Sequence, residues 1–215
     1  MQTAYLSLFP LELAPLPGES VKLHIFEPRY KQLIQECRDT GVRFGIPAFI
    51  DGALARHGTE MALEAIHAAY PGGEMDIAVK GQRPFKLERF EREAEGKPYP
   101  GGSVVFLPNE PCDPEDLAEA LARLYQELRA CLGGEEAEHG PGAPGEEGLA
   151  FSLAPRLGLS LEQRTELLAL QAERDRRQFL VEHLQEFLPI LRESSDIRRR
   201  VQGNGHFHRF PSIDL

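Results

Sequence analysis

The chain has 215 residues, of which 41% are hydrophobic and 27% are charged, a balance typical of a soluble globular protein. Its formal net charge of -10 disfavours sequence-independent binding to nucleic acid or to an anionic membrane surface, because both depend on basic side chains. The cysteines Cys37, Cys112 and Cys131 form no C-x-x-C pair, which favours reduced thiols over a disulfide framework or a zinc site. With no signal peptide and no apolar run of about 20 residues, the sequence predicts a cytoplasmic protein.

The first half of the chain predicts mainly strands. The apolar run over residues 4–9 ends at Pro10 and predicts a strand. Apolar and other residues alternate over 21–26, which predicts a second strand with one buried face. Further strands are expected at residues 44–50, 75–79, 85–90 and 103–107.

One helix is expected between the second and third of these strands. Pro28 suits the first helical position, where its missing N–H costs nothing, and Glu27 lies beside the positive helix end. Gly41 predicts the end of the helix. The expected buried face has helical spacing: Tyr30, Leu33, Ile34 and Cys37.

Residues 60–70 give conflicting signals. Their Ala, Leu, Glu and Met content predicts a helix. The following pair Gly72-Gly73, and the apolar run after it, indicate instead a hairpin turn with a returning strand. We predict strand for part of this segment.

The second half of the chain predicts helices around an acidic loop. Asp113 suits the cap of a helix that begins at Pro114 and carries leucines at helical spacing, Leu117, Leu121, Leu124 and Leu128. Residues 133–148 carry five glutamates and two prolines with nothing to bury, so we expect a solvated, mobile loop. An acidic interaction segment is the alternative.

From the loop to about residue 201 the chain is expected to be helical. Ser160 and Gln163 form a capping box, and Pro189 is expected to kink or interrupt the long last helix. The aromatic residues in 203–215 suggest a tail that packs back on the body.

Several motifs in the first half form a combined pattern. They are Leu8-Phe9-Pro10-Leu11, Leu16-Pro17-Gly18-Glu19, Leu23-His24-Ile25-Phe26-Glu27-Pro28-Arg29-Tyr30 and Arg43-Phe44-Gly45-Ile46, with Arg83-Pro84-Phe85-Lys86-Leu87 in a later hairpin. This pattern resembles the N-terminal, substrate-binding domain of Lon proteases, closest to the stand-alone bacterial members and to the related region of cereblon. The resemblance covers roughly residues 3–202.

The resemblance implies an α+β fold: a PUA-like twisted β pseudo-barrel with one inserted helix, followed by a C-terminal helical bundle subdomain. We expect the β-rich subdomain over residues 1–111 and the helical subdomain over 112–202, with the tail over 203–215. The family-motif residues are expected to be structural: Phe9, Pro10, Pro17, Gly18, His24, Phe26, Glu27, Pro28, Arg29, Tyr30, Phe44 and Gly45.

Few side chains suggest chemistry. His24 is expected to hydrogen-bond Glu27 or a backbone carbonyl. Glu27 and Arg29 are expected to form a structural ion pair, and a contact with a ligand is the alternative. Cys37 is expected to be buried and inert. The pair His206 and His208 has no further local ligand, so no metal site is predicted.

The only dense basic cluster is formed by Arg198, Arg199 and Arg200. Near a helix C-terminus these side chains complement the helix dipole. A contact with a partner or an anion is the alternative.

The resemblance implies a non-enzymatic protein-recognition module that binds exposed or unfolded segments of client proteins, or acts as an adaptor for a separate protease. No phosphate loop or Ser–Lys dyad is recognisable, so proteolysis by the chain itself is not expected, and no catalytic or cofactor-binding residue is predicted. The alternatives are an unrecognised hydrolase that uses His24 and an RNA-binding PUA-like protein, which the net charge opposes. Oligomeric state is not predicted.

Overall fold

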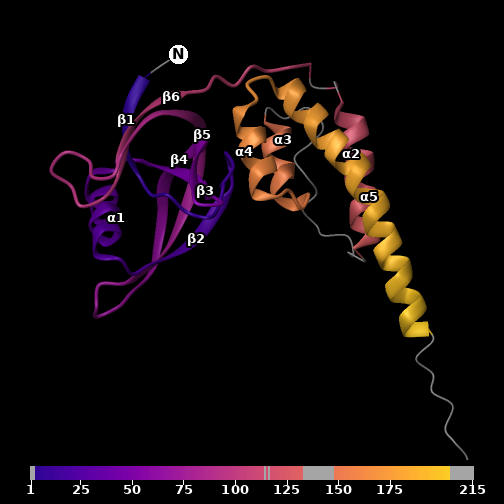
Figure 1. Ribbon diagram of the computed structural model, residues 1–215, viewed down its shortest axis with the longest axis horizontal. Coiled ribbons are helices and arrows are strands. Elements are labelled where there is room, and N and C mark those ends of the chain that lie inside the picture. Colours follow the sequence, from indigo (N-terminus) through magenta and orange to yellow (C-terminus); the bar gives the residue numbers. More distant parts are fainter. Residues whose placement is uncertain (1–2, 114, 116, 133–147, 204–215) are drawn as a thin grey trace, which may run out of the picture.

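The computed structural model describes residues 3–113, 115, 117–132 and 148–203, with side chains described up to residue 193. Within this part of the chain, a β-rich half and a helical half lie side by side (Figure 1). The α+β class predicted from the sequence is confirmed.

Six strands form one sheet that closes on itself: β1 (Thr3–Leu8), β2 (Ser20–Ile25), β3 (Phe44–Ile50), β4 (Ala53–Ala69), β5 (Met75–Glu91) and β6 (Gly101–Phe106). β1 pairs with β3 in parallel and with β6 antiparallel, and antiparallel pairs β3–β4, β4–β5 and β5–β6 complete the ring. The first part of β5 pairs with β2 and the last part with β6. The result is a twisted barrel with β2 attached at one side; its PUA-like character stays a prediction.

The prediction of strand for part of residues 60–70 is confirmed, because residues 60–69 lie in the long strand β4. The strands expected at 75–79 and 85–90 are the two ends of one continuous strand, β5. Pro84 lies inside that strand opposite Thr59. The continuity of β5 allows the strand to pair with β2 at one end and β6 at the other.

The barrel interior is filled by apolar side chains, and glycine makes room for them. A Cβ atom on Gly45 would lie 2.8 Å from atoms of both Leu8 and Phe85, two side chains without solvent exposure. The family-motif residue Gly45 therefore lets the Phe85 ring occupy the barrel centre. The other members of this cluster are Leu6, Val104 and Phe106.

Helix α1 (Pro28–Thr40) begins and ends as the sequence predicts. Pro28 is in its first turn, and Gly41 terminates it in the left-handed conformation with φ of 71°. All four residues of the expected apolar face are buried, against a cluster that includes Phe9, Phe44 and Ile77. Burial raises the pKa of the Cys37 thiol to about 11, so this cysteine is neutral at physiological pH.

Glu36, on the same helix, ties α1 to the segment before β6. Its carboxylate accepts hydrogen bonds from Lys97 Nζ at 2.7 Å and Tyr99 Oη at 2.8 Å. The hydrogen bonds from Lys97, then Gln32, then Tyr99 lower the pKa of Glu36 to about 2. A depressed carboxyl pKa stabilises the folded state above the unfolded pKa, and this stability is lost as the pH falls toward the folded pKa.

We therefore expect Glu36→Gln to lower the free energy of unfolding by about 1 kcal/mol at pH 6, a modest value because the pair is partly exposed. The gap between wild type and variant should shrink as the pH falls from about 4.5 toward 2. Urea unfolding at pH 6 and pH 3 measures it. A gap that is equal at both pH values would show that the carboxylate charge is not the source.

The helical half contains α2 (Ala118–Cys131), α3 (Leu149–Leu153), the 3-10 turn η1 (Ala154–Arg156), α4 (Leu161–Ala169) and α5 (Glu173–Gly203). The capping box of Ser160 and Gln163 at the start of α4 is confirmed. Pro189 does not interrupt the last helix, because α5 continues through it, and a kink there stays a prediction.

The first helix of this half begins later than predicted; Pro114, its predicted first residue, lies outside the described residues. Asp113 Oδ1 accepts the backbone N–H of Glu115 at 3.1 Å, and Leu117 adopts a left-handed conformation with φ of 58°. A left-handed residue cannot continue an α-helix, so α2 begins only at Ala118. The Asp113 side chain accepts from the residue two positions on, which is the hydrogen bond of an Asx turn.

One hydrophobic cluster joins the two halves. Ala14, Leu16 and Ala48, from the β-rich half, pack with the buried leucines of α2, α4 and α5. The division at residues 111 and 112 stays a prediction, and the cluster crosses it. Residues 133–147 of the acidic loop and 204–215 of the tail lie outside the described residues.

Three charged side chains are buried where α5 begins. Glu173 accepts hydrogen bonds from Arg176 Nε at 3.0 Å and Arg177 Nε at 3.2 Å, and from the backbone N–H of Ala150 at 2.9 Å. Arg176 also donates to Asn109 Oδ1. This network fastens α3 and the segment after β6 to α5.

Candidate functional site

An exposed aromatic groove lies beside the start of α1. It has a volume of about 360 Å³, and its lining is Pro10, Arg29, Tyr30, Phe49, Phe90, Arg92 and Pro100. The Phe49 and Phe90 side chains are each 39% exposed, unusual for phenylalanine. We call these seven residues the aromatic groove. Exposed apolar surface of this kind marks contact sites for polypeptides or other ligands.

The floor of the aromatic groove is held by the family motif. Tyr30 stacks on the buried Phe9 ring at a centroid distance of 3.8 Å, and the Arg29 guanidinium lies 4.6 Å from the Tyr30 centroid. Glu27 accepts from Arg29 Nε at 2.8 Å, which is the ion pair expected from the sequence. Burial raises the pKa of Tyr30, so its hydroxyl stays protonated at neutral pH. The groove therefore has a rigid base with a charged pair at its rim.

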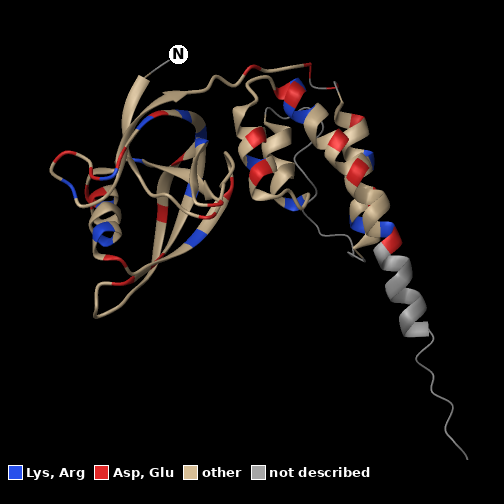
Figure 2. Cartoon of the chain, viewed as in Figure 1, with Lys and Arg blue, Asp and Glu red and all other residues tan. Residues whose placement is uncertain are grey.

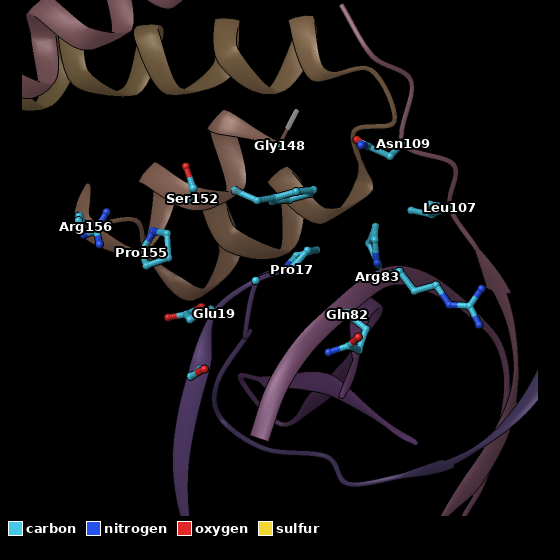
Figure 3. Close-up of a pocket in the computed structure, with 14 residues that line it drawn as sticks. Pro17, Glu19, Gln82, Arg83, Leu107, Asn109, Gly148, Ser152, Pro155 and Arg156 are labelled. Atoms are coloured by element: carbon cyan, nitrogen blue, oxygen red, sulfur yellow. The ribbon is translucent and has the colours of Figure 1, made fainter. Parts of the chain in front are cut away.

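A larger cleft, of about 690 Å³, lies between the barrel and α3–η1 (Figure 3). One side is the turn 17–20 and the middle of β5; the other is Phe151, Ser152, Pro155 and Arg156. Leu107 and Asn109, after β6, close one end. We call this cavity the interdomain cleft.

The turn that borders the interdomain cleft is fixed by Glu19. Its carboxylate accepts the backbone N–H of Leu16 at 2.9 Å and pairs with Arg164 of α4 at 2.9 Å. Gly18 adopts φ of 83°, a conformation that glycine tolerates without strain. The turn thus fastens α4 to the barrel.

A third polar cluster surrounds Asp76 on the exposed side of β2 and β5. His24 Nδ1 lies 2.6 Å from Asp76 Oδ1, and Tyr70 donates to Asp76 Oδ2 at 2.6 Å. The hydrogen bonds from Tyr70 and then His24 lower the pKa of Asp76. The predicted partners of His24, Glu27 or a backbone carbonyl, are replaced by Asp76. Among the described residues, no serine, threonine or cysteine hydrogen-bonds the His24 ring, so the cluster has no nucleophile in place.

The described residues contain no group of three metal-ligating side chains, and no helix among them is long and apolar enough to cross a membrane. Figure 2 shows acidic and basic residues interspersed along the described strands and helices.

Comparison with known proteins identifies the family. Residues 5–186 match the family described as the ATP-dependent protease La (LON) substrate-binding domain. The chain belongs to the Lon substrate-binding domain family. No curated protein sequence matches it.

Two solved structures of Lon N-terminal domains are similar to this one. The Lon N-terminal domain protein from Xanthomonas campestris is 27% identical, with a TM-score of 0.61 and coverage of 83% of this chain and 98% of that chain. The N-terminal domain of a Lon protease from the Mycobacterium avium complex has a TM-score of 0.64 at 13% identity and covers 86% of this chain and 100% of that one. The second likeness concerns the fold alone.

The Lon family-motif residues are distributed over several places. Phe9, Phe44 and Gly45 lie in the core. Pro10, Arg29 and Tyr30 line the aromatic groove, and Pro17 and Gly18 line the interdomain cleft. His24 and Phe26 are exposed at the end of β2, and Pro28 starts α1. That all of these residues are structural stays a prediction.

Residues of this Lon domain that line the two cavities were missed by sequence reasoning: Phe49, Phe90, Arg92, Asn109, Phe151 and Arg156. No local pattern marks them. Arg198, Arg199 and Arg200 lie near the C-terminal end of α5, but their side chains lie outside the described residues. Their partner contact stays a prediction.

Proposed function

We propose that this chain is a non-enzymatic recognition module that binds exposed apolar segments of client polypeptides in the aromatic groove. It acts on its own or as an adaptor that delivers clients to a separate protease. The observation that carries the proposal is the pair of exposed phenylalanines, Phe49 and Phe90, over a rigid base. Membership of a substrate-binding family supports a polypeptide as the ligand. A cytoplasmic location remains part of the proposal.

The chemistry of the groove fits an unfolded segment better than a folded surface. Aromatic rings and prolines gain apolar contact with any extended chain that exposes large side chains, without a fixed sequence. Its rigid base reduces the entropy lost when a segment binds. The Arg29 side chain, at the rim, is partly exposed to water, and its ion pair with Glu27 holds it in place.

The double variant Phe49→Ser and Phe90→Ser is expected to weaken client binding by at least about tenfold, because two apolar anchors are removed. Fluorescence anisotropy would measure the affinity for a labelled, unfolded peptide that carries Phe and Leu in a Gly-Ser background. Both side chains are already partly exposed, so the melting temperature should change little.

The matched control is Ile190→Ser, which removes another exposed apolar side chain, on α5 outside the groove. Its affinity should equal that of the wild type. An equal loss of affinity in the double variant and in Ile190→Ser would indicate non-specific apolar adhesion. Undiminished binding by the double variant would refute the groove as the client site.

A further inference from the structure

The interdomain cleft is separate from the aromatic groove and has a different chemistry. Its volume of about 690 Å³ lies in the range of cavities that hold small ligands or a few residues of a peptide. We propose that it binds an apolar carboxylate, a ligand that joins a hydrophobic body to a free carboxylate group. A polypeptide C-terminus and a small organic acid are the two sources of this chemistry.

The apolar part of the ligand would lie against a preformed wall. Phe151 lines the cleft, and this residue is only 6% exposed. The buried Arg176 guanidinium lies 4.6 Å from the ring centroid and restrains it. Pro17, Pro155 and Leu107 add apolar surface around the ring. Such a wall can bind the hydrophobic part of a ligand without first having to rearrange.

The charges that border the cleft favour an anion. Glu19 is neutralised by Arg164, and Arg83 shares the single buried carboxylate of Glu60 with Arg43. Arg156 is exposed and has no ion-pair partner among the described residues.

A further acid near the rim is Glu64, which accepts a hydrogen bond from Ser20 Oγ. With Arg176 and its partner Glu173 included, the charged side chains named around the cleft are five arginines and four glutamates, in a chain whose net charge is -10. The local field therefore attracts an anion although the whole chain repels one.

A second polar contact is available at the opposite end of the cleft from Arg156. Arginine carries only donors, so Asn109 must present Oδ1 to Arg176, which leaves its Nδ2 donor for another group. In Figure 3, Asn109 and Arg156 lie at opposite ends of the cleft. Arg156 can pair with a carboxylate, and Asn109 Nδ2 can donate to a carbonyl oxygen. A peptide C-terminus supplies both groups, whereas a small acid supplies only the first.

Isothermal titration calorimetry with three probes tests the proposal: the peptide Gly-Ala-Leu-Phe with a free carboxylate, the same peptide with a C-terminal amide, and hydrocinnamate. We expect amidation to weaken peptide binding at least about tenfold, since a charge-assisted hydrogen bond is lost. Arg156→Gln should weaken the free acid to the level of the amide. The matched control is Arg38→Gln on α1, at the side of the barrel away from α3 (Figure 1).

The relative affinities of the two acids identify the source. If the peptide acid binds more tightly than hydrocinnamate, and Asn109→Ala weakens the binding of the peptide acid, the cleft is assigned to polypeptide C-termini. If hydrocinnamate binds as tightly as the peptide acid, and Asn109→Ala leaves its affinity unchanged, the cleft is assigned to small acids. Ser152→Trp, at an exposed position, should fill the cleft and abolish the binding of both acids, with little change in melting temperature. Equal binding of acid and amide, no binding of either acid at millimolar concentration, or binding that survives Ser152→Trp overturns the proposal. The Phe49→Ser and Phe90→Ser variant should retain cleft binding, so failure of one proposal leaves the other intact.

Discussion

Glu173→Gln is expected to lower the free energy of unfolding by about 3–5 kcal/mol and the melting temperature by roughly 6–20 °C. Glu173, Arg176 and Arg177 are each at most 2% exposed. The amide preserves the shape of the side chain but removes the carboxylate charge that both guanidinium groups share. A buried cation that loses its counter-charge keeps its desolvation cost, and this is why the expected loss exceeds that of a surface pair.

Thermal and urea unfolding at neutral pH measure this prediction. The control is Glu182→Gln in the same helix, where an exposed carboxylate accepts only from Gln178. It should change the unfolding free energy by no more than about 0.5 kcal/mol. Similar values for the two variants would mean that the buried network contributes no more than a surface contact. If this prediction is correct, Glu173→Gln should also weaken ligand binding in the interdomain cleft, because Arg176 restrains Phe151.

Elements whose ends depend on neighbouring residues were predicted well. Pro28 and Gly41 define α1 because one residue lacks a donor that the helix start does not need and the other adopts the left-handed conformation. Ser160 and Gln163 define the start of α4 by mutual capping. In each case the determining interaction spans only a few residues, so the sequence contains it.

Elements that depend on distant residues were predicted less well. The continuity of β5 follows from its pairing with β2, β4 and β6, which closes the barrel. A local reading divides this strand at Gly81 and Pro84, because both residues usually weaken strands. The start of α2 failed for a related reason: the Asp113 side chain can cap a helix or a turn equally well, and only the surrounding packing decides.

The candidate sites were the least predictable feature. Phe49 and Phe90 resemble core phenylalanines in the sequence, and their exposure depends on where β3 and β5 end relative to α1. The interdomain cleft combines residues more than 130 positions apart, such as Pro17 and Phe151. Their proximity is set by the ion pair between Glu19 and Arg164 and by the buried network at the start of α5, neither of which has a local sequence signature.

The contact between Gly81 and the turn 16–19 carries the last prediction. A Cβ atom at Gly81 would lie 2.2 Å from the carbonyl oxygen of Leu16, a backbone atom that cannot rotate away. Gly18 N–H donates to the Gly81 carbonyl and Gly81 N–H to the Glu19 carbonyl, each at 2.9 Å. These two hydrogen bonds hold the Pro17-Gly18-Glu19 motif against β5, so the motif depends on a glycine more than sixty residues away.

Gly81→Ala is therefore expected to cost about 2–4 kcal/mol in unfolding free energy, since the added methyl group must push the turn off β5 and break both hydrogen bonds. Gly72→Ala, at the β4–β5 turn, is the matched control, because its new Cβ would approach only the flexible Glu74 carboxylate, at 3.1 Å. It should be within about 0.5 kcal/mol of the wild type. Urea unfolding compares the two variants, and amide hydrogen exchange at Gly18 and residue 81 shows whether the contact has opened. A stable Gly81→Ala variant with both amides still protected would contradict the prediction. An unstable one would show that the motif by which the family is recognised works through this backbone contact, which also forms one wall of the interdomain cleft.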